Sequence, residues 1–272
     1  MYKKLSKNAT IGVVGVSNSI KRENKESIFL KAKKLFEDHG YKLKFSDNVF
    51  IDYYGMAGNA KQKAEELNNM FKDPSIDLIM CLDGGDSCNT IIDYLDYELI
   101  KNNPKPIVGY SDITVLLETI NKMTGIITFH GPAFLSFGED YGEKCMENFV
   151  NTFEKGLFDD FLNSNIKEVR KGNSKGKLIG TKYFPDVNNN ILLVERYITT
   201  PSETYNHFYQ LKQKGILDKI SGLLIGYNYS FESKKVAEKQ ILRWRILQKK
   251  YLKIMIFLYI SVKLLVMRWQ TL

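Results

Sequence analysis

The chain has 272 residues, of which 44% are hydrophobic and 26% charged, as is usual for a globular protein of one large or two smaller domains. Its formal net charge is +8. Eight lysines and arginines between residues 239 and 272, where no acid occurs, account for the whole excess. The charge therefore does not indicate a basic surface, and we expect neither nucleic acid nor a membrane as a partner.

The cysteine content indicates the compartment. Cys81, Cys88 and Cys145 are too few for a disulfide framework and fit a reducing cytoplasm. None has a partner at metal-ligand spacing, so we expect small buried residues and no metal. The N-terminal residues lack an apolar core of signal-peptide length. We expect a cytoplasmic protein.

Strand and helix patterns alternate through the first half of the chain. Strand patterns cover 11–16, 41–45, 77–82, 106–109 and 126–129, of which 41–45 alternates, and helical spacing covers 22–39, 59–71, 87–94 and 113–123. This alternation predicts an α/β fold with a parallel sheet covered on both faces. Ligands then bind at the carboxyl ends of the strands.

A polar segment at 161–177, rich in Lys, Asn, Ser and Gly, is typical of an interdomain linker. It predicts an N-terminal domain over 1–160 and a C-terminal domain over 178–272. Beyond the linker, strand patterns at 191–194 and 221–226 flank a helical pattern at 201–214.

The tetrapeptide Gly109-Tyr110-Ser111-Asp112 lies between a strand pattern and a helical pattern. A serine on such a turn projects its hydroxyl above the sheet edge, beside the amides of the helix N-terminus. A nucleophile for acyl transfer is displayed in this way. The alternative is that Ser111 or Asp112 only caps the helix.

Several segments, taken in order, carry a family resemblance. They are Asp77-Leu-Ile-Met-Cys-Leu-Asp-Gly-Gly-Asp-Ser-Cys-Asn89, Leu95–Ile100, Asn103-Pro-Lys-Pro-Ile-Val-Gly-Tyr-Ser-Asp-Ile-Thr114 and Thr128-Phe-His-Gly-Pro-Ala133, with weaker matches at Ile191–Arg196 and Leu211–Gly226. Together they resemble the LD-carboxypeptidases and their relatives, the microcin C immunity peptidases. The resemblance spans roughly residues 8–230.

The resemblance implies a serine peptidase with a Ser-Glu-His triad. The triad would be split between a Rossmann-like N-terminal domain and a smaller β-rich C-terminal domain. Ser111 matches the nucleophile and Glu195 the acid that orients the histidine. Without the resemblance, Glu195 would be interpreted as an ion-pair partner of Arg196 or of another base.

The resemblance also implies the surroundings of the nucleophile. The backbone amides of Gly85 and Asp112 match the oxyanion hole, and Gly84 and His130 lie near the substrate. Glycines at 84 and 85 suit this role, because a Cβ would obstruct close approach of a substrate to the backbone. The implied substrate is a small peptide, either a murein L,D-peptide or a microcin C-like peptide–nucleotide. No cofactor is implied, and the family implies a homodimer.

Two features depart from the family pattern. The triad histidine is expected near the C-terminus, whereas this chain has only His39, His130 and His207. The segments 178–180 and 181–185 also abut, where relatives carry additional residues, which indicates an internal deletion.

The final segment, 236–272, has an unusual composition. It holds both tryptophans, and from residue 239 it has no Gly, Pro, Asp, Glu or Asn. Its apolar run at 254–262 is too short to span a bilayer, although a basic membrane-surface helix is an alternative. We expect the resemblance to stop near residue 235 and the rest to be non-native, frameshifted sequence.

Two further functions compete with a peptidase. The first is a catalytically dead remnant that at most binds peptide, because the expected histidine is absent. The second is a nucleotide-binding protein that uses Gly12-Val-Val-Gly15. That segment lacks the lysine of a phosphate-binding loop and the third glycine of a dinucleotide fingerprint.

Overall fold

The computed structural model describes residues 4–156, 182–184, 186–194 and 201–225. Contacts divide the chain into two units, 1–166 and 167–272. The predicted linker at 161–177, Glu195 and the segment 236–272 lie outside the described residues.

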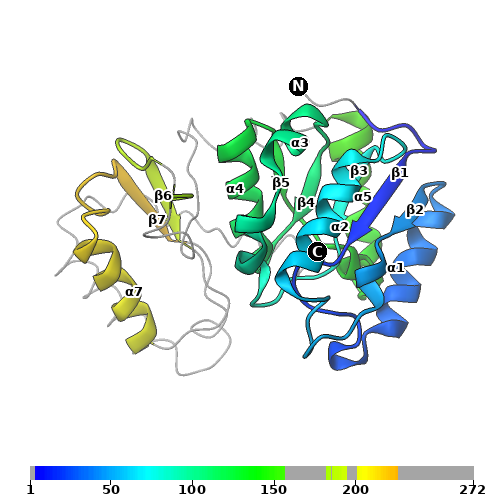
Figure 1. Ribbon diagram of the computed structural model, residues 1–272, viewed down its shortest axis with the longest axis horizontal. Helices are drawn as coiled ribbons and strands as arrows, with labels where there is room; N and C mark the ends of the chain where they lie inside the picture. The colour runs from blue at the N-terminus through cyan, green and yellow to red at the C-terminus, as the bar shows by residue number, and fades with distance from the viewer. Residues whose placement is uncertain (1–3, 157–181, 185, 195–200, 226–272) are drawn as a thin grey trace. The chain divides into compact units, whose positions relative to one another are not determined.

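The first unit is built on one sheet of parallel strands in the order β2-β1-β3-β4-β5. The predicted alternation of strands and helices, and hence the α/β fold, is confirmed (Figure 1). The strands are β1 (Thr10–Val14), β2 (Lys42–Phe45), β3 (Leu78–Cys81), β4 (Ile107–Gly109) and β5 (Thr128–His130).

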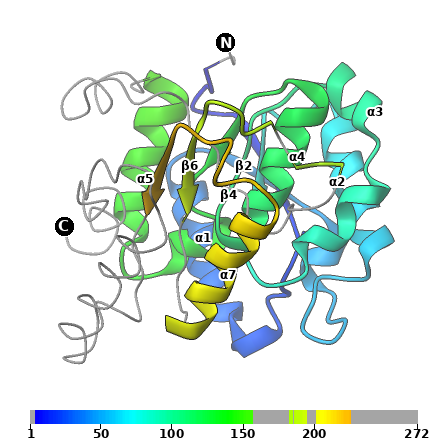
Figure 2. The ribbon, with the colours of Figure 1, turned by 90° about the vertical axis from the view of Figure 1, so that its left-hand side faces the viewer.

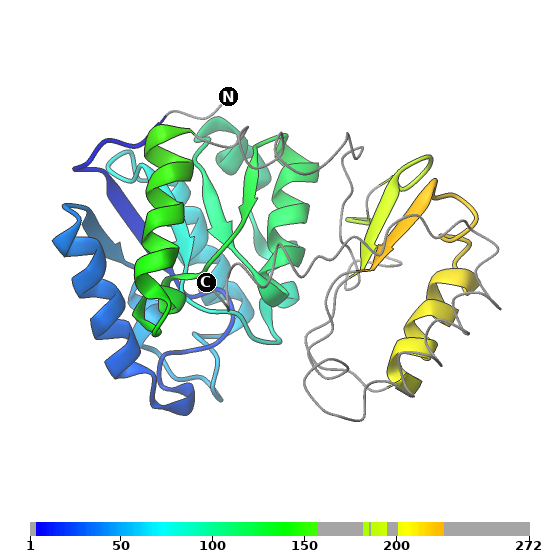
Figure 3. The same ribbon diagram turned by 180° about the vertical axis from the view of Figure 1, so that it is seen from behind.

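Helices cover both faces of this sheet. The α-helices are α1 (Glu26–Asp38), α2 (Ala60–Lys72), α3 (Tyr97–Asn102), α4 (Thr114–Thr124) and α5 (Gly142–Val150). α1 packs against α5, while α3 packs against both α2 and α4. Seen from behind, α5 lies in front of the sheet (Figure 3). The central strands β1, β3 and β4 are therefore buried between two helical layers, as their apolar sequences require.

Short helical turns connect the longer elements. The 3₁₀ turns are η1 (Arg22–Asn24), η2 (Asp47–Phe50), η3 (Cys88–Tyr94), η4 (Ser111–Ile113) and η5 (Phe134–Gly138), and a π-helical turn, η6 (Asn151–Lys155), follows α5. The prediction of one helix over 22–39 is wrong at its start. Glu23 and Asn24, within η1, have left-handed backbones, so the regular helix α1 begins only at Glu26.

Local sequence explains where these helices begin and end. Asn59 and Gln62 form a reciprocal capping box at the start of α2, which satisfies two backbone N–H groups that have no partner within the helix. α4 ends at Gly125, whose left-handed backbone provides a regular C-terminal stop. Between α1, η5 and α5, aromatic side chains fill the core, with Phe36 stacked on Phe134 at 5.6 Å.

The strand order determines where a ligand site can form. From β1 the chain crosses to β2 on one side, whereas from β3 it crosses to β4 on the other. The segments that follow β1 and β3 thus diverge at the switch point of a doubly wound sheet, where such folds bind ligands.

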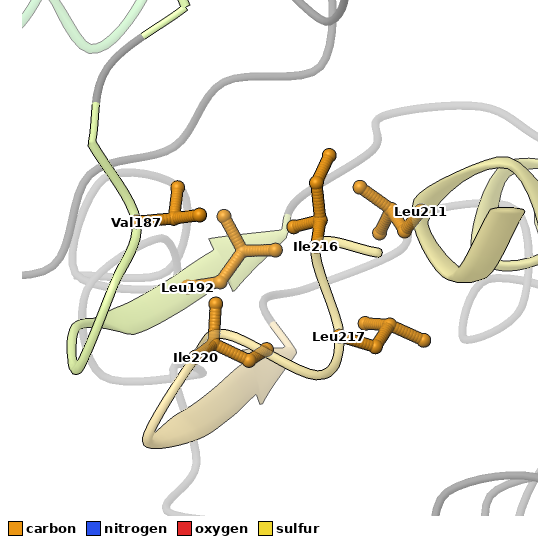
Figure 4. Packing of buried hydrophobic residues seen from close by; sticks show 6 residues of the cluster. All are labelled: Val187, Leu192, Leu211, Ile216, Leu217 and Ile220. Atoms are coloured by element: carbon orange, nitrogen blue, oxygen red, sulfur yellow. The ribbon is translucent and has the colours of Figure 1, made fainter. Parts of the chain in front are cut away.

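The second unit contains β6 (Ile191–Val194), α7 (Pro201–Gln213) and β7 (Gly222–Ile225). The two strands pair in parallel, and α7 is the crossover between them (Figure 2). Residues from β6, from α7 and from the loops form its apolar core, which consists of Val187, Leu192, Leu211, Ile216, Leu217 and Ile220 (Figure 4). The predicted strands and helix of this region are confirmed.

The described part of the chain has no helix that is long and apolar enough to cross a membrane. Within the same residues, no three His, Cys, Asp or Glu side chains gather as a metal site would require. The three cysteines are buried and form no disulfide. Burial raises the pKa of Cys81 and that of Cys145, which makes both thiols poor nucleophiles.

Candidate active site

Ser111 follows β4 at a sharp turn. Tyr110 is extended, with a φ of −148°, and Ser111 then takes a left-handed φ of 63° before α4 begins. A left-handed backbone costs a serine roughly 1 kcal/mol. The side chain is exposed, and its hydroxyl has no hydrogen-bond partner among the described residues. This strained strand–turn–helix arrangement is the geometry of a nucleophile elbow.

The capping alternative is wrong. Neither η4 nor α4 has a side-chain hydrogen bond at its N-terminus. The Asp112 carboxylate lies instead among buried groups on the far side of the turn.

Gly84 and Gly85 follow β3 and pack beside the elbow. A Cβ on Gly84 would lie 2.9 Å from the Ser111 Cβ and 3.2 Å from its Oγ. A Cβ on Gly85 would lie 2.3 Å from the Asn18 Oδ1. Only glycine fits at either position, because real Cβ contacts are longer. The Gly85 amide has no acceptor within the described part of the chain, so it is available to a ligand.

A half-buried ion pair fixes the start of this glycine turn. The Asp83 carboxylate accepts hydrogen bonds from the Gly84 amide at 2.9 Å and from the Lys25 ammonium at 2.8 Å. Burial alone would lower the pKa of Lys25, but the hydrogen bond and charge of Asp83 outweigh it, and the pKa is raised. Lys25 therefore stays charged and holds Asp83 in place.

Beneath the elbow, Asp112 joins three segments. Its Oδ2 accepts hydrogen bonds from the Ser17 hydroxyl at 2.7 Å and from the Cys88 amide at 3.0 Å. Its Oδ1 is buried and has no partner among the described residues. The residue after the candidate nucleophile is thereby tied to the segments that follow β1 and β3.

A buried lysine completes this polar network. Lys63, on α2, is fully buried and donates to the Ser87 carbonyl at 3.2 Å and to its hydroxyl at 2.9 Å. The Ser87 amide in turn donates to the Ser17 Oγ at 3.2 Å. Burial lowers the pKa of Lys63, and the Cys88 and Asp112 groups offset only part of this effect.

Two tyrosines and a histidine flank the site. Burial raises the pKa of Tyr110 and that of Tyr141. His130, at the end of β5, pairs in register with Gly109. Its side chain is exposed, yet the surrounding protein removes enough water that desolvation lowers its pKa. His130 is thus a neighbour of the elbow and carries no charge near neutral pH.

The structure brings most of the sequence-predicted residues together. Gly84 and Gly85 meet Ser111 and Asp112 at the carboxyl ends of β3 and β4. Glu195 lies outside the described residues. The other histidines lie elsewhere on the chain: the His39 ring contacts the Leu35 carbonyl at the end of α1, and His207 is on the exposed side of α7.

Sequence reasoning missed the supporting residues. Ser17 and Asn18 directly follow the first strand pattern, where no motif indicates a role for them. Lys63 had a detectable signal, because it precedes Leu67 by four residues and so lies on the apolar face of its helix. A lysine at such a position indicates a specific buried partner.

Two family models match the chain. The LD-carboxypeptidase N-terminal domain matches residues 11–131, and the LD-carboxypeptidase C-terminal domain matches residues 173–262. The second match contradicts our expectation that the resemblance ends near residue 235.

Curated relatives agree with these matches. A putative carboxypeptidase of Vibrio cholerae is 28% identical, with 76% of this chain and 73% of that protein covered. The microcin C7 self-immunity protein MccF of Escherichia coli is 29% identical, with 75% and 71% covered. A probable murein peptide carboxypeptidase of Bacillus subtilis is 27% identical, with 82% and 73% covered.

Solved structures extend the likeness to the fold. MccF in complex with aspartyl sulfamoyl adenosine is 25% identical, with a TM-score of 0.75 over 93% of this chain and 88% of that one. MccF in complex with glutamyl sulfamoyl guanosine has a TM-score of 0.73 at 25% identity, over 89% and 86%. The family matches, the relatives and the shared fold lead to one conclusion: this chain belongs to the LD-carboxypeptidase family.

Proposed function

We propose that this protein is a serine peptidase of the LD-carboxypeptidase type, which hydrolyses an amide bond in small peptides. The observation that carries the proposal is the left-handed, exposed Ser111 beside Gly84 and Gly85. A serine bears such strain where its hydroxyl must stand clear of the backbone. Membership of a family of carboxypeptidases supports hydrolase activity.

The proposed reaction is acyl transfer in two steps. The Ser111 oxygen attacks the scissile carbonyl, the C–N bond breaks, and the hydroxyl proton passes through a base to the leaving amine. Water then hydrolyses the acyl-enzyme and restores the hydroxyl. The Gly85 and Asp112 amides would donate to the oxygen of the tetrahedral intermediate, each contributing about 3 kcal/mol to the lowering of the barrier. Glu195 would orient the base.

The proposed substrates follow the named activities of the relatives. Murein L,D-peptides match the murein peptide carboxypeptidases, and peptide–nucleotide conjugates match the MccF proteins, which bind aminoacyl sulfamoyl nucleosides. We propose that the reaction requires neither a metal nor an organic cofactor. We also propose that the protein acts in the cytoplasm and as a homodimer.

The direct test is covalent labelling of Ser111 with a fluorophosphonate probe. In the wild-type chain, we expect mass spectrometry to find a phosphonylated peptide that contains Ser111. The Ser111→Ala variant should not be labelled. Hydrolysis of a tetrapeptide with a C-terminal D-residue, followed by chromatography, would define the reaction. Equal labelling of the wild-type chain and Ser111→Ala would contradict the proposal.

A second candidate is a remnant that binds peptide without hydrolysis. It is favoured by one observation, the absence of any histidine after His207. A serine without its base loses most of its rate, by a factor of about a million in a comparable triad. Peptide binding without phosphonate labelling would support this candidate, whereas labelling abolished by Ser111→Ala would exclude it.

A further inference from the structure

Arg22 lies on a strained turn at the edge of the candidate site. It begins η1, and the next two residues, Glu23 and Asn24, have left-handed φ values of 63° and 51°. Neither is glycine, so each costs about 1 kcal/mol of backbone strain. Consecutive strain of this kind persists only where neighbouring contacts fix the turn. The turn therefore presents Arg22 in a defined position.

Contacts on both sides hold the arginine. Its Nη1 donates to the Asn18 Oδ1 at 2.8 Å, and its aliphatic stem passes Gly55, where a Cβ would lie 3.5 Å from the Arg22 Cδ. The Ser19 amide donates to the Gly55 carbonyl at 3.0 Å, which fixes the loop against which the stem packs.

Asn18 connects the guanidinium to the candidate oxyanion hole. The Asn18 amide donates to the Gly84 carbonyl at 3.3 Å, and its Oδ1 occupies the space that a Cβ on Gly85 would need. The guanidinium of Arg22 thus lies one side chain away from the unpaired Gly85 amide. The Lys25 ammonium, which also reaches this glycine turn, is engaged by the Asp83 carboxylate at 2.8 Å, whereas the Arg22 guanidinium has its hydrogen bond to Asn18.

The guanidinium has donors to spare. Arginine carries several N–H groups in a planar fork, and the structure gives it one hydrogen bond, to Asn18. The nearest carboxylates, Glu23 and Asp86, each lie 4.0 Å away, beyond hydrogen-bond distance, and both are largely exposed. Their charges are screened by water, so the fork remains available to a second anion.

We propose that Arg22 binds the anionic group of the substrate nearest the scissile bond. The inference rests on the proposed function, because a carboxypeptidase substrate ends in a carboxylate one residue beyond the scissile carbonyl. Consecutive Cα atoms are about 3.8 Å apart, so this carboxylate stays close to the oxyanion hole. The planar fork suits a carboxylate, which it binds through two parallel hydrogen bonds. A phosphoryl group of a peptide–nucleotide has the same recognition chemistry.

The test compares ligands that differ only in this charge. In the full chain carrying Ser111→Ala, which prevents turnover, calorimetry measures binding of an L,D-tetrapeptide, of its C-terminal amide, and of an aminoacyl sulfamoyl nucleoside. We expect the free acid to bind at least about tenfold more tightly than the amide. Arg22→Gln should bring this ratio close to one, and Arg22→Lys should retain part of it.

The neighbouring Lys21→Gln is the matched control, because it removes the same charge from an exposed side chain paired with Glu26. It should leave the ratio unchanged. A ratio that survives Arg22→Gln, equal affinity for acid and amide, or no binding of either peptide overturns the proposal for carboxylates. If Arg22→Gln weakens only the nucleoside, the phosphoryl analogue is the ligand. Phosphonate labelling of Ser111 tests the proposed function separately, so the two failures are distinguishable.

Discussion

At the residue scale, the tetrapeptide around Ser111 could be interpreted as a helix cap or as a nucleophile turn from sequence. Both residue types cap helices, and no pattern of side chains encodes a left-handed serine. The backbone settles the cap question, because Ser111 has a φ of 63° and no capping bond is present. Gly84 and Gly85 were predictable as close-approach positions, since glycine is the residue that permits close backbone approach. What they approach, Ser111 and Asn18, depends on long-range packing.

Gly84→Ala should disable the elbow. The new Cβ would lie 2.9 Å from the Ser111 Cβ, so the serine or the glycine turn must shift. We expect the rate of fluorophosphonate labelling to fall at least about a hundredfold, as for loss of an oxyanion donor. Gly125→Ala is the control, because Gly125 has a φ of 76° but an open environment. It should lower the melting temperature without changing the labelling rate, and equal rates in both variants would contradict the prediction.

Lys63→Met should destabilise the fold through Ser87. The substitution leaves the Ser87 carbonyl and hydroxyl without their buried donor, at a cost of about 1–3 kcal/mol. Lys61→Met, an exposed change on the same helix, should cost less than about 0.5 kcal/mol. Urea unfolding at neutral pH measures the free energy of unfolding of both variants. Similar losses in the two would show that the Lys63–Ser87 hydrogen bonds do not stabilise the fold.

The pH dependence of the Lys63 effect has a defined sign. The pKa of Lys63 is lowered in the folded chain from 10.5, so the unfolded chain binds more protons between the lowered pKa and 10.5. The stability of the wild-type chain therefore rises with pH in that window relative to Lys63→Met. The difference in unfolding free energy should grow as the pH approaches 10.5. A difference that shrinks there would show that the ammonium is not desolvated.

At the element scale, the sequence predicted the central strands because they are short apolar runs, and it predicted β2 from the alternation of Lys42-Leu-Lys-Phe45. The β3 residues are all buried, and such continuous runs indicate a strand buried on both faces. The start of α1 was not predictable, since residues 22–24 are polar and contain neither glycine nor proline. Their left-handed turn depends on contacts with Asn18 and Gly55. Helical periodicity, which reflects only the spacing of apolar residues, does not detect such contacts.

Asp73 links the end of α2 to β2 and gives a second pH prediction. A hydrogen bond from Lys44, followed by those from the Ser75 hydroxyl and amide, lowers the pKa of Asp73 to about 2. The ionised Asp73 carboxylate therefore stabilises the folded chain fully above the unfolded pKa of 3.8, and this stabilisation is lost as the pH falls through about 2. Because Lys44 is half exposed, Asp73→Asn should cost only about 1 kcal/mol at pH 6.

Thermal melts of Asp73→Asn and the wild-type chain from pH 6 downward measure this loss. The two curves should converge as the pH approaches 2. In a Lys44→Met background, Asp73→Asn should lower the stability by less, but still measurably. The reason is that the Ser75 amide and hydroxyl still donate to the Asp73 Oδ1, at 2.9 and 2.7 Å. If the stability lost in Asp73→Asn were independent of pH, the stabilisation could not come from the ionised Asp73 carboxylate.

At the scale of the whole molecule, the alternation of elements predicted a parallel sheet, but not its strand order. Order is decided by how the helical layers pack, which no local pattern specifies. For the final segment, 236–272, the sequence led to a prediction that the comparisons do not support: its composition suggested frameshifted sequence. The C-terminal family match reaches residue 262, which argues against that hypothesis for most of the segment. Sequencing the source gene would test it, and an intact reading frame through residue 272 would defeat it.

The proposed homodimer is testable with the full chain. Sedimentation velocity at micromolar concentration should show one species of twice the chain mass, and the same value should appear for Ser111→Ala, which changes no apolar surface. A monomer at all concentrations would contradict the family-based proposal.

The hydrogen bond from Ser17 to Asp112 spans 95 residues of sequence, and this separation has a consequence for folding. During synthesis, β1 and the serine emerge long before the elbow that accepts the serine hydroxyl. Contacts of such high sequence separation form slowly, because the intervening chain must first be ordered. A ribosome paused before residue 112 would therefore carry a chain whose Ser17 hydroxyl still lacks its Asp112 acceptor, and the strained serine turn would form only after that contact becomes possible.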